Sequence, residues 1–138
     1  MERIRHLVQF DSEAFLRGTG PDDRGALPLA SWVATQLHRA GIDAGSLAQS
    51  SHHVDEDHFG GYELTVPARP PIHLFCGTLE HDLHEHHIEV WCSRRGLQRP
   101  NEGSAALAQR VVDALHAALA AHPDVHRLHW DRGGPSTT

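Results

Sequence analysis

The chain has 138 residues, of which 39% are hydrophobic and 22% are charged, which is typical of one folded domain with its own core and not of a disordered chain. Its 18 acidic and 12 basic residues give a formal net charge of −6, which disfavours nucleic acid as a partner because phosphate binding needs a basic surface. No apolar run approaches the roughly 20 residues that a membrane span requires.

The N-terminal part of the chain predicts a strand, a loop and a helix. Residues 3–10 alternate apolar and polar side chains closely enough to favour a strand. Glycine, proline and aspartate are dense in residues 17–28, which predicts a loop. We expect a helix from Pro28, which suits a first helical position, to Gly41, because the position after a helix favours glycine.

The central and C-terminal parts predict three strands, a second helix and a last strand. Apolar residues alternate in residues 61–66, 72–79 and 87–94, which is typical of strands. The second helix is expected to start after Asn101 or Ser104, either of which can cap it, and to end at Pro123. Its expected apolar stripe consists of Leu107, Val111, Ala114, Leu115, Ala118 and Ala121. A strand over residues 125–130 and a flexible tail over 131–138 complete the chain.

The predicted order, β-α-β-β-β-α-β, indicates a single α+β domain. Short separations between the central strands favour an antiparallel meander. We expect a mainly antiparallel sheet with both helices packed on one face. Phe75, Glu89 and Trp91 would then lie on the other face, either as an exposed patch that meets a partner or under residues 10–27 or 43–58.

Two short segments are rich in histidine and acid. Residues 80–89 contain four histidines and four carboxylates, and residues 52–58 contain three of each. Imidazole and carboxylate groups bind zinc and nickel, so the first segment offers a candidate metal site, made of His81, His84, His86 and His87. Its spacing matches neither a structural zinc site nor a metalloprotease.

The alternative for these segments is a solvated hairpin tip. All 12 basic residues are arginine, which indicates a GC-rich bacterial genome whose codons also favour histidine. Part of the histidine content would then reflect codon usage.

Cys76 and Cys92 would face each other if the hairpin closed symmetrically about residue 84. They would then be either a redox pair or, as we favour, two small buried residues of one core layer. Two cysteines do not form a disulfide scaffold, and the N-terminus has no apolar signal core, so we expect a cytoplasmic protein.

No complete catalytic motif is present. His87-Ile88-Glu89 matches part of the zinc deaminase signature, but the required Pro-Cys-x-x-Cys is absent. Phosphate-binding loops and nucleophile elbows are also absent. We therefore predict no catalytic residues and no cofactor, with a small enzyme assembled from distant residues as an alternative.

Residues 55–66 (Asp-Glu-Asp-His-Phe-Gly-Gly-Tyr-Glu-Leu-Thr-Val), the Ala/Leu-rich helix and the ending at residues 123–130 resemble small bacterial α+β proteins. Many of these are similar to immunity proteins of interbacterial toxin systems. The resemblance implies a non-catalytic acidic protein that occludes a toxin's active site, with carboxylates that match a basic cleft and steer association. The candidate partner-binding residues are Asp55, Glu56, Asp57, Glu80, Asp82, Glu85, Glu89 and Trp91.

Two functions are therefore expected from the sequence. The first is an acidic protein-binding module whose partner is a cognate toxin or another basic protein, without nucleic acid or membrane. The second is a divalent-metal protein that binds or senses zinc or nickel through the segments at 52–58 and 80–89.

Overall fold

The secondary structure follows the predicted order, with one short strand added. The computed structural model describes residues 3–16, 26–45, 47–50, 61–78, 85–93 and 98–136. Its elements are β1 (Arg3–Asp11), the 3-10 turn η1 (Ala14–Leu16), α1 (Ala26–Arg39), β2 (Ala48–Ser50), β3 (Gly61–Val66), β4 (Ile72–Thr78), β5 (Glu85–Ser93), α2 (Glu102–Ala121) and β6 (His126–Arg132). The added strand is β2, whose three residues are too few to show a periodic pattern.

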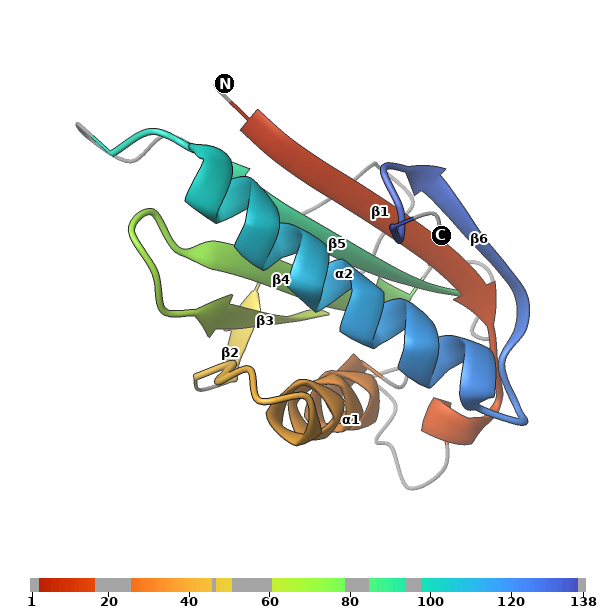
Figure 1. Ribbon diagram of the computed structural model, residues 1–138. Coiled ribbons are helices and arrows are strands. Elements are labelled where there is room, and N and C mark those ends of the chain that lie inside the picture. Colours follow the sequence, from red (N-terminus) through yellow and green to blue (C-terminus); the bar gives the residue numbers. More distant parts are fainter. Residues whose placement is uncertain are drawn as a thin grey trace.

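The strands form one sheet in the order β2-β3-β4-β5-β1-β6, and every neighbouring pair is antiparallel. β3, β4 and β5 form the predicted meander, whereas β1 lies between β5 and β6. Both helices lie on one face of the sheet (Figure 1), where α1 contacts β3 and β4, and α2 contacts β5 and β1. The predicted single α+β domain is confirmed.

The core lies between the sheet and the two helices. Alternate residues of the central strands, such as Val8, Leu74 and Val90, point toward the helices and are fully buried. The predicted stripe of α2 is only partly correct, because the buried face consists of Ser104, Ala108, Val111, Val112, Leu115 and Leu119. Alanine and leucine occur all around this helix, so its apolar pattern alone did not identify the packed face.

The predicted residues are correct for the end of α1 and the start of α2. α1 starts at Ala26, so Pro28 is its third residue and not its first as predicted. Gly41 has a φ of 80°, and the Ile42 N–H donates to the Leu37 carbonyl at 2.8 Å, which is a Schellman ending. Asn101 caps α2 by accepting a hydrogen bond from the Ser104 N–H at 3.0 Å. Within the described ranges, neither helix has the length and apolar character needed to cross a membrane.

Candidate functional site

The strand ends next to the two segments rich in histidine and acid lie at one end of the sheet. We call these two segments the acidic segments. Ser50 and Gly61, which flank residues 51–60, are register partners. Thr78, which precedes residues 79–84, pairs with His86 beside Glu85. Because β3 and β4 are antiparallel with Tyr62 opposite Cys76, these strand ends share one end of the sheet. We call this the acidic end.

Most predicted partner and metal residues belong to the two segments attached at the acidic end. These residues lie outside the part of the chain that the structure describes, and they are Asp55, Glu56, Asp57, Glu80, Asp82, His81 and His84. Of the remaining predicted residues, the structure places Glu85, His86, His87, Glu89 and Trp91 on β5.

The described strand ends at the acidic end include the carboxylates of Asp11 and Glu85. Asp11 is the cross-strand partner of Glu85, and like charges at opposed positions repel. Nη1 of Arg127 lies 3.2 Å from Oδ2 of Asp11 and offsets this repulsion. The Arg127 side chain is 84% exposed, so this ion pair contributes little to stability and leaves the arginine accessible.

Glu89 is not a surface residue, contrary to the prediction that it contacts a partner. Its side chain is only 2% exposed, and its Oε1 accepts a hydrogen bond from Nε of Arg5 at 3.1 Å. Phe75, opposite Glu89 in the register, is fully buried. The predicted exposed patch of aromatic and acidic residues is therefore absent at these two positions, and Glu89 has a structural role as the counter-ion of Arg5.

Trp91 and His87 extend this row of polar contacts along the same face. The Trp91 ring stacks on the His73 ring with a centroid distance of 5.2 Å. Nε2 of Gln9 and Nδ1 of His87 are 3.2 Å apart. Trp91 is half-buried and thus keeps some surface for a partner, whereas His87 is buried.

His86 and His87 cannot bind one metal ion together, because successive strand residues point to opposite faces of a sheet. His86 lies on the helix side, with its ring centroid 5.5 Å from that of Phe10 and 5.7 Å from that of Phe15. Its Nε2 is 3.2 Å from the carbonyl oxygen of Ser12. Within the described ranges, no group of three or more His, Cys, Asp or Glu side chains is placed to hold a metal ion.

The two cysteines are buried and free. Cys76 pairs with Ile88 rather than with Cys92, and Cys92 pairs with Ile4 of β1. The predicted symmetric hairpin was therefore wrong in register, and the favoured interpretation as core residues is correct. Burial raises the pKa of Cys76 to about 12 and also raises the pKa of Cys92, against a hydrogen bond with Ser104 that lowers it.

A hollow lies at the other end of the sheet, between α1, β3 and α2. Its lining consists of Gly41, Ile42, Asp43, Val66, Pro67, Leu107 and Arg110. The Asp43 carboxylate already accepts a hydrogen bond from the Gly45 N–H at 3.0 Å. These lining residues include no pairing of a nucleophile with a base, so the hollow does not support the enzyme alternative.

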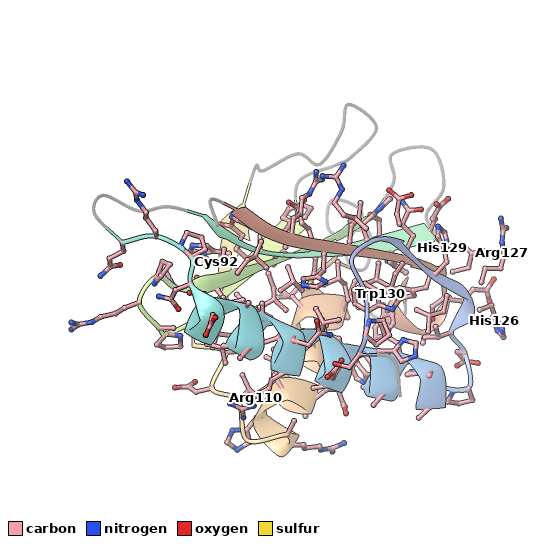
Figure 2. All side chains as sticks on the ribbon, turned by 45° about the horizontal axis from the view of Figure 1, so that its top comes forward. Cys92, Arg110, His126, Arg127, His129 and Trp130 are labelled. Atoms are coloured by element: carbon pink, nitrogen blue, oxygen red, sulfur yellow. The ribbon has the colours of Figure 1, made fainter. Side chains whose placement is uncertain are left out.

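Two histidines that the sequence patterns did not single out tie the C-terminal segment to the domain. Nδ1 of His6 accepts a hydrogen bond from the Gly134 N–H at 3.0 Å. Nδ1 of His116 accepts one from Nε1 of Trp130 at 3.1 Å. Figure 2 shows Trp130 lying over α2, whereas His126 and Arg127 project away from the domain.

Asp113 and Gln109 of α2 complete this arrangement. Asp113 accepts hydrogen bonds from the backbone N–H and the hydroxyl of Ser136, at 2.7 and 2.9 Å. Gln109 donates to the Gly134 carbonyl at 3.0 Å. We call the side chains of His6, Gln109, Asp113 and His116 the C-terminal clasp. The sequence predicts a tail over residues 131–138. In the structure, β6 extends to Arg132, and Gly134 and Ser136 form the hydrogen bonds with Gln109 and Asp113.

Burial lowers the pKa of His6, and the nearby Asp113 carboxylate opposes this shift. The backbone hydrogen bond from Ser136 is the main cause of the lowered pKa of Asp113. Glycine is needed beside the clasp, because a Cβ on Gly133 would clash with the imidazole ring of His6. In the sequence, the Gly133-Gly134 pair is the feature that could have pointed to this close approach of the C-terminal segment to His6.

Comparison with models of known protein families gives no match, and no curated protein sequence matches the chain.

Proposed function

We propose that the chain is a non-catalytic protein-binding module whose acidic end meets a basic partner protein, as an immunity protein meets the active site of its toxin. The observation that supports this proposal is the sheet topology. The strand ends bordering both acidic segments share one end of the sheet with Asp11 and Glu85. Carboxylates from separate parts of the sequence would thus act on one partner surface.

The mechanism is occlusion guided by charge. A net charge of −6 attracts a basic cleft over a distance of about 10 Å, the screening length at moderate salt. Complementary charge raises the association rate and selects partners. The binding residues are Asp55, Glu56, Asp57, Glu80, Asp82 and Glu85, with Trp91 as an aromatic contact; Glu89 is excluded by its ion pair with Arg5.

The test begins with cross-linking in cells that make the protein, followed by mass spectrometry to identify the captured partner. The purified pair is then titrated by calorimetry. We expect a dissociation constant below about micromolar. Neutralising Glu80, Asp82 and Glu85 together as Glu80→Gln, Asp82→Asn and Glu85→Gln should weaken binding at least about tenfold, with a loss that shrinks as salt is added.

Asp43→Asn with Glu102→Gln is the matched control. Both acids are exposed; Asp43 lies beside Val66 in the hollow, and Glu102 begins α2, away from the acidic end (Figure 1). This control should bind as tightly as the natural protein. The proposal is wrong if the purified pair binds only above about micromolar, or if the control weakens binding as much as the acidic-end variant does.

The same topology supports a second candidate, a zinc or nickel site made by the two histidine segments at the acidic end. Residues 52–58 and 81–84 contribute five histidines to segments that leave the sheet at one end. Zinc titration should give an affinity better than about micromolar that His81→Ala with His84→Ala abolishes and His86→Ala leaves in place. Absence of binding, or equal loss in both variants, rejects this candidate.

A further inference from the structure

β6 is the last strand of the sheet order and pairs on one side only, with β1. Within the described ranges no strand covers its other side. Five of its seven residues are exposed, and Leu128 and Trp130 are half-buried. An edge strand presents unpaired backbone N–H and C=O groups that can hydrogen-bond another strand. Among the residues that the structure describes, the outer side of β6 is therefore open to pairing with a further strand.

The sequence of β6 is complementary to itself in the antiparallel direction. With His129 at the centre of symmetry, Arg127 of one copy lies opposite Asp131 of the second copy, and Leu128 lies opposite Trp130. Opposite charges and aromatic–aliphatic contacts are favourable cross-strand pairs. A two-fold axis repeats each pair, so the contact contains two of each kind.

We propose that two copies of the chain associate through antiparallel pairing of β6 about His129. The register is specific. Centring the pairing on Leu128 places Arg127 opposite His129, and centring it on Trp130 places Leu128 opposite Arg132. Each of these alternatives loses the pairing of Arg127 with Asp131 and that of Leu128 with Trp130, and opposes only one apolar residue, Leu128 or Trp130, to its own copy. Only the His129 register satisfies both at once, with no like charge opposed.

The geometry of Arg127 limits the length of this contact. Its φ is 55°, and β6 also departs from regular register with β1 on either side of His129 and Trp130. The regular part of the edge is thus short and lies around these two residues. The Arg127 side chain lies at one end of this stretch, where it is 84% exposed beside Asp11.

The dimer is closed and leaves the acidic end free. The two-fold contact uses both β6 edges, and the opposite edge of the sheet, β2, has only three residues. β6 begins beside Asp11 at the acidic end, and antiparallel pairing directs the two acidic ends away from each other. One dimer would therefore present two separate surfaces of the kind that a basic partner meets.

Sedimentation velocity over a range of protein concentrations tests the proposal. The natural chain should form dimers in a concentration-dependent manner. Arg127→Asp and Asp131→Arg should each weaken dimerisation at least about tenfold, because each opposes like charges twice. Aspartate tolerates the left-handed backbone of position 127 better than most residues, so Arg127→Asp should fold normally, as circular dichroism can verify.

Mixing the two single variants provides the decisive result. In a mixed dimer, the aspartate introduced at position 127 of one copy meets the arginine introduced at position 131 of the other. The second pair of the two-fold contact is the natural one, Asp131 with Arg127, so the mixture should dimerise as the natural chain does. The double variant should also recover.

Arg110→Asp, which changes an exposed charge on α2, is the control and should have no effect. The proposal fails if the natural chain stays monomeric at every concentration, if the single variants dimerise normally, or if mixing them restores nothing. None of these outcomes depends on partner binding at the acidic end.

Discussion

The indole Nε1 of Trp130 donates a hydrogen bond to Nδ1 of His116 across 3.1 Å, joining the last strand to α2. An indole N–H can only donate, so Nδ1 of His116 must accept with its lone pair. The Gly134 backbone N–H imposes the same requirement on Nδ1 of His6. A protonated imidazole carries hydrogen on both nitrogens and accepts at neither. The C-terminal clasp therefore requires both histidines to be neutral.

The stability of the protein should fall as the pH drops below the ordinary His6 pKa of 6.5. Burial lowers this pKa in the folded state, so the unfolded chain binds the proton more tightly and stability decreases with acid until the folded pKa is passed. Asp113, with a pKa lowered from 3.8, adds to this loss only in stronger acid. Urea denaturation at about pH 7.5 and about pH 5 measures the change.

His6→Asn separates His6 from the other 13 histidines. The asparagine oxygen can take the place of Nδ1 as acceptor for the Gly134 N–H, and it does not titrate. The variant should show a smaller loss of stability between these two pH values than the natural chain. An equal loss in both proteins would show that His6 does not contribute.

Trp130→Phe should destabilise the protein by about 1 kcal/mol at neutral pH, because it removes the hydrogen bond to His116 and keeps most of the apolar contact. Urea denaturation of the variant and the natural chain at about pH 7.5 measures the difference in the free energy of unfolding. No measurable loss of stability in the variant would contradict the hydrogen bond between Trp130 and His116.

Glu89→Ala should cost about 2 kcal/mol or more, since it leaves the Arg5 guanidinium without its carboxylate at a site where Glu89 is buried. Glu85→Ala is the control on the same strand; Glu85 is half-buried at the acidic end, and its removal should change stability by about 0.5 kcal/mol or less. Thermal unfolding compares the two. Equal losses of stability in the two variants would mean that the Arg5–Glu89 ion pair does not stabilise the fold more than Glu85 does.

Neither cysteine should react with a thiol reagent such as 5,5′-dithiobis(2-nitrobenzoate) while the protein is folded. Both side chains are buried, and a Cys76 pKa of about 12 leaves almost no thiolate near pH 8. Reaction should follow the rate of unfolding and become rapid in denaturant. Fast labelling of one thiol in native conditions would show that the core opens near that residue.

Local sequence patterns predicted most of the elements. Apolar and polar residues alternate in the strands, and residues such as Asn101 and Gly41 cap the helices. The pairing of β1 with β5 and β6 was not predictable in this way. It joins residues more than 70 positions apart, as in the pairs of Leu7 with Glu89 and with Arg132, and no local pattern records such a contact.

The candidate site was harder to predict for the same reason. Glu89 looked like a surface acid because its strand places it opposite Ile88 and Val90, and only the register with β1 reveals Arg5 as its partner. His86 and His87 looked like one cluster in sequence, whereas strand geometry separates them across the sheet. The C-terminal clasp depends on residues from β1, α2 and β6, whose proximity arises only after folding.

Each of the three tryptophans lies against a histidine. Trp130 is bonded to His116, Trp91 stacks on His73, and the Trp32 ring is 5.6 Å from that of His122. The natural fluorescence of the protein therefore reports on three separate places in the fold, and single Trp→Phe variants would assign each part of the signal without any attached dye.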